Sequence, residues 1–173
     1  HGVLYSIYSV YSAKDDSTTE CVQITGYTDG LDYDLVIPEE IEGRKVTWIG
    51  PGAFRNCTTL HSVYIPDGVQ IRENAFNKCI NLESVRLPED LDRLRDGTFN
   101  FCESLASIEL PEKISYIEGA QFSDCYSLKS AKLPQYPSRF FMGELSNQLF
   151  ARCFELKPEN ISWPKNMSDK DKE

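Results

Sequence analysis

Six cysteines are the residues of this sequence best suited to chemistry, because a thiol can bind a metal, form a disulfide or act as a nucleophile. No two of them have the Cys-x-x-Cys spacing of zinc ribbons and thioredoxin-type sites. Cys21 stands apart, whereas the others recur at intervals of 22, 23, 23 and 28 residues. We interpret the recurring thiols as small apolar side chains that fill one buried column. They are Cys57, Cys79, Cys102, Cys125 and Cys153.

Two chemical alternatives for this column stay open. Equivalent side chains of neighbouring repeats would lie about 5 Å apart, within the range of a disulfide, although side chains stacked in parallel do not point at each other. Metal binding or catalysis by the thiols is the second alternative. We expect six free thiols, of which the five in the column react slowly.

The remaining groups that could support catalysis are few or exposed. The only histidines are His1 and His61, and a triad or metal cluster would need His61 beside a nucleophile or a second ligand. An N-terminal His1 could chelate copper, but we interpret it as a chain boundary. Acidic pairs such as Glu39-Glu40 fall in predicted turns, although a glycosidase pair is possible in any acidic sequence. We therefore expect no enzyme, no catalytic residues, no metal and no cofactor.

An internal repeat defines the elements that must position these side chains. Five segments share a frame of Phe, then Cys three residues later, then Leu three residues after that. Further apolar columns accompany the frame on both sides. A fixed period of this length predicts a solenoid, in which each coil buries its apolar face only against its neighbours. The frame begins at Phe54, Phe76, Phe99, Phe122 and Phe150.

Within one coil the spacing changes from helical to strand-like. Phe, Cys and Leu at i, i+3 and i+6 predict a short helical or 3₁₀ turn. Residues 62–65 then alternate, with Val63 and Ile65 inward, which predicts a short strand. Pro66 cannot donate to a sheet ladder and ends that strand, and a proline recurs at this point in later coils. The predicted fold is a β-rich α/β solenoid of about five to six coils with a parallel sheet.

Residues 49–60, with the sequence IGPGAFRNCTTL, resemble the leucine-rich repeats of the bacterial surface-antigen type, called BspA-like or treponemal-type repeats. Later coils depart from that pattern outside the main core columns: the Gly after Ile becomes Arg or Glu. The resemblance covers residues 31–164. It implies a leucine-rich-repeat fold in a secreted or cell-surface protein of host-associated microbes, with a role in adhesion or protein binding. It implies no shared reaction and no shared ligand.

The two ends of the chain are atypical, as terminal coils of a solenoid must be. Residues 3–12 alternate in strand fashion and a second extended run follows, so we predict an N-terminal β cap over residues 1–30. Residues 31–165 form the solenoid, and residues 31–38 resemble the strand half of a preceding coil. Residues 166–173 are a charged tail. These parts make one structural domain overall.

Length and charge exclude several classes of function. A chain of 173 residues has room for one domain, and 18 basic against 27 acidic residues give a net charge of 18 − 27 = −9. Such an acidic protein is a poor candidate for binding nucleic acid or an anionic membrane. No apolar run approaches the ~20 residues of a membrane helix. Because no initiator Met or signal peptide is present, we expect a processed product or a fragment of a larger protein.

The outward face of the predicted sheet is where we expect function. One outward column is Ser in four coils, at Ser62, Ser84, Ser107 and Ser130, whereas the next changes size and charge at each step, and a binding face needs such variety. The sequence therefore predicts a noncatalytic protein-binding or adhesion module of a cell-surface or secreted microbial protein. The residues expected to contact the partner are Ser62, Tyr64, Arg86, Glu109 and Lys132.

Two alternatives to this face remain. The segment 135–143 is longer than its counterparts and carries Phe140 and Phe141, which would mark a different contact patch if exposed. The chain could instead be a structural spacer of a larger surface protein, with no ligand of its own. If the chain is a protein-binding module, we expect its partner to be a host or microbial surface protein. Neither the binding module nor the spacer involves nucleic acid or membrane insertion.

Overall fold

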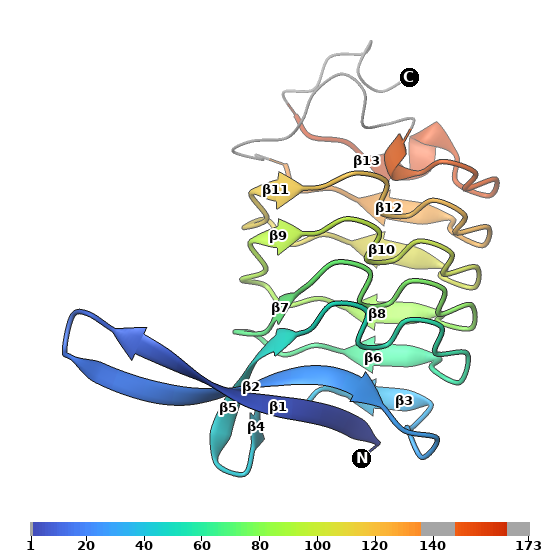
Figure 1. The fold of residues 1–173 in the computed structure, drawn as a ribbon. Helices are drawn as coiled ribbons and strands as arrows, with labels where there is room; N and C mark the ends of the chain where they lie inside the picture. Colours follow the sequence, from blue (N-terminus) through green and yellow to red (C-terminus); the bar gives the residue numbers. More distant parts are fainter. Residues whose placement is uncertain (1, 136–147, 166–173) are drawn as a thin grey trace.

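The computed structural model describes residues 2–135 and 148–165 of the chain. Successive coils stack along one axis, with the N-terminal strands at one end and the last described coil at the other (Figure 1). The predicted β-rich solenoid with parallel strand pairing is confirmed. His1, Phe140, Phe141 and the tail 166–173 lie outside the described residues.

Each regular coil contributes one strand to each of two series of parallel strands, on different sides of the stack (Figure 1). The first series, here called the first sheet, has an inward Val, Ile, Leu or Ala at the centre of each three-residue strand. Its early member β3 lies where the sequence predicted the strand half of a preceding coil. The strands are β3 (Asp34–Val36), β6 (Ser62–Tyr64), β8 (Ser84–Arg86), β10 (Ser107–Glu109), β12 (Ser130–Lys132) and the two-residue β13 (Ile161–Ser162).

The second series, here called the second sheet, lies on another side of the coils. Each of its strands ends on a buried Ile or Leu, the residue five positions before the Phe of the frame. Parallel pairs join β5 to β7 and β9 to β11. The strands are β5 (Arg44–Ile49), β7 (Gln70–Ile71), β9 (Arg93–Leu94) and β11 (Tyr116–Ile117).

The phenylalanines of the frame form a continuous stack through the core. The rings of Phe54, Phe76 and Phe99 lie nearly parallel, with centroids 5.2 and 5.4 Å apart. The stack continues to Phe122 at 5.8 Å and to Phe150 at 5.7 Å, although the last pair is tilted by 20°. Because each ring packs against the coil before and the coil after it, the column ties neighbouring coils together.

The cysteines of the frame form a second buried column beside the rings. Four of the five thiols donate to the carbonyl oxygen of the phenylalanine one coil earlier, as Cys79 does to Phe54 at 3.1 Å and Cys153 to Phe122 at 3.0 Å. The Cys57 sulfur, in the first coil of the frame, lies 3.5 Å from the Thr59 hydroxyl instead. The side chains therefore point along the stack toward a backbone acceptor. All six cysteines are free and buried.

The turn between Phe and Cys is built from separate hydrogen-bonded turns rather than a continuous helix. The Cys57 amide donates to the Phe54 carbonyl, the i to i+3 bond expected for a 3₁₀ turn. The residue two positions after each Phe, however, has a left-handed backbone, which interrupts helical propagation. These residues are Asn56, Lys78, Phe101, Asp124 and Arg152, with φ between 60° and 65°. The one 3₁₀ segment with described bounds is η1 (Pro158–Asn160).

An antiparallel hairpin precedes the coils. Strand β1 (Val3–Ser12) pairs with β2 (Ser17–Tyr27), and β2 in turn pairs in parallel with β5. The short strand β4 (Glu40–Ile41) covers the other side of β5. The hairpin projects well beyond the coils in Figure 1. Within the described residues, no helix has the length and apolar character needed to cross a bilayer.

Candidate functional site

The outward residues of the first sheet form a column in two parts, because its strands pair in register in two groups, β3 with β6 and β8, and β10 with β12 and β13. Val36 lies opposite Tyr64, and Tyr64 opposite Arg86. Further along the stack, Glu109 lies opposite Lys132. Within each part, paired side chains stand about one strand spacing apart, as the sequence analysis predicted. No strand pair joins β8 to β10 in the described part of the chain, so hydrogen bonding between strands does not fix the step from Arg86 to Glu109.

Tyr64 and Arg86 form one unit of this column. The guanidinium carbon of Arg86 lies 5.8 Å from the Tyr64 ring centroid, within cation–π range. The Nη2 nitrogen of Arg86 lies 3.4 Å from a carboxylate oxygen of Glu89. The Nη1 nitrogen donates a hydrogen bond to the Leu87 carbonyl oxygen. The Tyr64 side chain nevertheless remains 45% exposed. The pair thus presents an aromatic ring with its orientation restricted and much of its surface open to a partner.

Glu109 and Lys132 form the second unit. Their charged groups are joined by a hydrogen-bonded ion pair on the exposed surface. The hydrogen bond to Glu109 is the main reason that the pKa of the Lys132 ammonium is raised above its ordinary value. Exposed ion pairs of this kind contribute little to stability. Their effect here is to place both signs of charge side by side.

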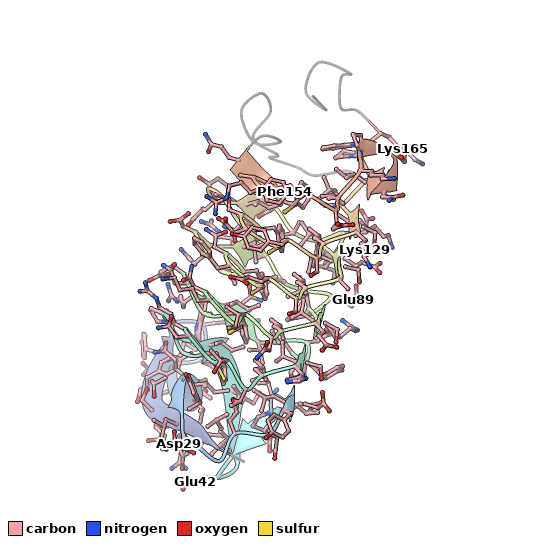
Figure 2. All side chains as sticks on the ribbon, turned by 90° about the vertical axis from the view of Figure 1, so that its right-hand side faces the viewer. Asp29, Glu42, Glu89, Lys129, Phe154 and Lys165 are labelled. Atoms are coloured by element: carbon pink, nitrogen blue, oxygen red, sulfur yellow. The ribbon has the colours of Figure 1, made fainter. Side chains whose placement is uncertain are left out.

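A shallow hollow of about 370 Å³ lies between these two units. Its walls come from neighbouring coils, so it exists only when the coils are stacked. Acidic residues just after the strand-ending prolines lie along its rim, and the Glu112 carboxylate also accepts the Gln135 amide at 2.9 Å. Glu89 marks this region among the side chains of Figure 2. The charged residues of the lining are Arg86, Glu89, Glu109, Glu112 and Lys132.

The serine column keeps the rest of the face flat. Ser62 is the one member tied to a side chain of the preceding coil, since its hydroxyl donates to Asp34 at 2.6 Å. Ser84, Ser107 and Ser130 are exposed. Small hydroxyl side chains at these positions leave the neighbouring variable column accessible from the side.

Two exposed residues of this face were missed by the sequence analysis. Val36 is 66% exposed and continues the variable column, and Tyr33 is 65% exposed and lies 5.6 Å from the His61 ring. The signal for Val36 was available, because it precedes Ile37-Pro38 as Tyr64 precedes Ile65-Pro66. Nothing comparable marked Tyr33, because its equivalents in the following coils are His61, Glu83, Ala106 and Lys129, with no shared residue type.

A second exposed aromatic site was also missed. Phe154, labelled in Figure 2, is 77% exposed and stacks on Tyr126 with 5.8 Å between ring centroids. The Arg152 guanidinium donates to the Tyr126 hydroxyl at 3.1 Å. This site lies beside the Phe-to-Cys turns, away from the variable column of the first sheet.

The core thiols and His61 lie in different surroundings. Burial raises the pKa of the Cys102 thiol to about 12 and that of Cys79 well above its ordinary value, so both are protonated at neutral pH. His61 lies on the exposed face, with Nδ1 3.8 Å from a Glu83 oxygen. Across the described part of the chain, no group of three His, Cys, Asp or Glu side chains could hold a metal ion.

Fold and face together define a leucine-rich-repeat solenoid, in which a short parallel sheet with variable outward residues lines one side of the stack. The BspA type leucine rich repeat region matches residues 36–157 in six copies, which is more than half of the chain. The chain therefore belongs to the BspA type leucine-rich-repeat family, as the resemblance predicted.

Several solved structures share this fold. A leucine rich cell surface protein from Faecalibacterium prausnitzii is 26% identical with a TM-score of 0.72, over 95% of this chain and 39% of that protein. A leucine rich repeat protein from T. pallidum is 24% identical with a TM-score of 0.62, over 94% of this chain and 82% of the other. One from Bacteroides ovatus is 21% identical with a TM-score of 0.53, over 96% and 53%. This chain thus spans about two fifths of the Faecalibacterium protein. A search of curated proteins found no match.

Proposed function

We propose that this chain is a noncatalytic protein-binding module whose partner contacts the first sheet at Tyr64, Arg86, Glu109 and Lys132. The observation that carries the proposal is the register of Tyr64 with Arg86, which holds a half-exposed ring against a guanidinium on a rigid sheet. Tyr and Arg are, together with Trp, the residue types most enriched in interface hot spots. Ser62 borders the same contact.

The charge pattern of the face indicates the kind of partner. Arg86, Glu109 and Lys132 alternate in sign along the stack, and Glu89 and Glu112 line the hollow between the two units. A partner surface with both basic and acidic side chains fits this pattern better than a uniformly basic one. The exposed Tyr33 and Val36 add an apolar contact at the N-terminal end of the face.

The setting we propose is the surface of a bacterial cell or its secreted fraction, with a host or microbial surface protein as partner. Support comes from membership of the family and from the Faecalibacterium structure, which is that of a cell surface protein. The noncatalytic assignment is supported by the protonated, buried thiols and by the exposed, unclustered His61.

The chain offers a matched control for testing the face. On the second sheet, the Arg93 guanidinium lies 5.7 Å from the Tyr116 ring centroid, nearly the same geometry as Arg86 over Tyr64. We therefore compare the double variant Tyr64→Ala/Arg86→Ala with Arg93→Ala/Tyr116→Ala. Proteins captured by the wild type from host and microbial extracts are quantified on both, and circular dichroism checks the fold.

We expect the first-sheet variant to lose at least about 2 kcal/mol of binding free energy and the second-sheet variant to bind as the wild type does. If the first-sheet variant binds normally while Phe140→Ser with Phe141→Ser abolishes binding, the segment carrying these two phenylalanines is the site. If no captured protein responds to any of these changes, the chain acts as a structural spacer and the proposal is wrong.

A further inference from the structure

Strand β1 is an edge strand with one of its sides open. It pairs with β2, and no other strand of the described residues pairs with it. The hairpin projects from the coils, so that much of β1 lies away from them (Figure 1). Backbone N–H and C=O groups along that edge are therefore available to another strand.

This edge lacks the protection that edge strands usually carry. Residues 2–13 contain no charged residue and no proline, and β1 is ten residues long. By contrast, the edge strands β3 and β4 have only three and two residues, and each includes a carboxylate, Asp34 or Glu40. Short length and charge are common ways to prevent unwanted strand pairing. The register shift in β1 lies between Leu4 and Tyr5, near one end, and leaves most of the strand regular.

The side chains along β1 also suit a paired strand. Leu4, Ile7, Val10 and Tyr11 are all exposed, and serines separate the larger residues. Aliphatic and aromatic residues that face one another across two strands stabilise the pairing. The strand thus offers apolar contacts on both faces of the sheet in addition to its backbone groups.

We propose that β1 pairs antiparallel with β1 of a second copy of this chain about a two-fold axis, which joins two hairpins into one continuous sheet. A two-fold contact places the same surface on both sides, so the contact must be self-complementary. An uncharged strand meets this requirement, because β1 itself brings no carboxylate into the contact between two copies of a protein with net charge −9. Two carboxylates that reach its side chains, Glu42 and Asp16, accept hydrogen bonds from the Tyr5 and Tyr11 hydroxyls. Because β1 has no charged side chain, it has no electrostatic preference for a charged strand of a different protein.

The size of the contact indicates its strength. Ten residues at about 3.4 Å per residue give an edge about 34 Å long, and a sheet is about 10 Å thick. The contact therefore covers roughly 340 Å² per copy, below the roughly 800 Å² per partner of a standard interface. Since the two copies together bury roughly 680 Å², the size of a weak contact, we expect a reversible dimer that forms only at high protein concentration. The first sheet remains open in it, so a dimer would present two copies of that face.

The test uses the full chain and two lysine variants of the hairpin. Ser9→Lys places an ammonium group near the centre of β1, and Thr19→Lys places one on β2, where Thr19 is paired with Val10. Both original residues are exposed, so both variants should fold. Sedimentation velocity over a range of concentrations measures self-association, and amide hydrogen exchange at low and high concentration locates the contact.

We expect the wild type and Thr19→Lys to dimerise alike, and Ser9→Lys to associate about tenfold more weakly, because the two-fold contact brings an ammonium group from each copy into an otherwise uncharged strand pair. Amides of β1 on the open edge should exchange more slowly in the dimer. A wild type that stays monomeric throughout overturns the proposal. A dimer that Ser9→Lys leaves intact, or in which β1 amides gain no protection, also overturns it.

Discussion

The thiol of Cys79 donates to the carbonyl oxygen of Phe54, one coil earlier, across 3.1 Å. That oxygen also accepts the amide of Cys57 within its own coil, at 3.0 Å. The thiol is therefore a second donor to a carbonyl that already has a partner. This explains how a weakly polar side chain fits the core at this position without leaving a buried group unpaired.

The phenylalanine stack should make central coils more sensitive than the last one. Phe99→Ala empties a fully buried site with rings on both sides and should lower the free energy of unfolding by about 3–5 kcal/mol. Phe150→Ala should cost less, because Phe150 is only partly buried and tilted by 20° against Phe122. Denaturant melts measure both. Equal losses would contradict a stack held by nearest-neighbour contacts.

The buried thiols should resist alkylation until the protein unfolds. The Cys102 pKa of about 12 leaves very little thiolate at pH 8, so labelling in native buffer without reductant should be slow. In denaturing buffer all six should react. Mass spectrometry counts the labels, and a Cys79 to Cys102 link would contradict the packing described above.

Cys79 and Cys102 should make stability fall at alkaline pH. Burial holds the native pKa of both thiols above the unfolded value of about 8.5, so the folded state holds these protons more tightly. The contribution of Cys102 is complete below pH 8.5 and is lost as the pH rises through its native pKa of about 12. Urea melts between pH 7 and 11 should show this decline. A Cys102→Ala variant should show a smaller pH dependence, and an unchanged slope would rule out Cys102 as a contributor.

A β-branched side chain should be unfavourable two positions after each frame Phe, where the backbone is left-handed. Lys78, with φ of 61°, tolerates that conformation as an unbranched residue. Lys78→Val should cost about 1–2 kcal/mol, whereas Lys78→Asn should be nearly neutral, since Asn56 occupies the same position one coil earlier. Thermal melts compare the two. A valine variant as stable as the asparagine variant would show that the backbone relaxes there.

The N-terminal end of the phenylalanine stack is closed by a tyrosine. The Tyr27 ring lies 6.1 Å from Phe54, and this contact supports our proposal that residues 1–30 cap the first coil. Tyr27→Ala should destabilise the protein by about 1–3 kcal/mol. Tyr11→Ala, at the exposed end of the hairpin, should change stability by less than about 0.5 kcal/mol. If denaturant melts show a similar loss of unfolding free energy for both variants, the hairpin does not act as a cap through Tyr27.

The core and the variable column could be predicted because a constant period fixes both. Once Phe, Cys and Leu recur every 22 or 23 residues, each must meet its equivalent one coil away, and the outward Tyr64 and Arg86 must do the same. That these outward residues contact a partner remains a proposal.

Features outside the period could not be predicted in the same way. The left-handed residue after Phe is Asn, Lys, Phe, Asp or Arg, so no residue type marks it. Gly50 is a second case: a Cβ there would lie 2.9 Å from the Ile24 carbonyl oxygen, because β2 passes close to the first coil. Later coils have no hairpin beside them and carry arginine or glutamate instead.

The order of coils along one axis gives the chain a mechanical property. The first and last described strands lie at opposite ends of the stack in Figure 1, so tension on the two ends of the chain acts across the contacts between coils. Since each coil is held only by its neighbours, such a load would detach terminal coils one at a time. A coil of 23 residues would release roughly 80 Å of extended chain. The solenoid would therefore lengthen in steps under pulling and could absorb a sudden force without failing as a whole.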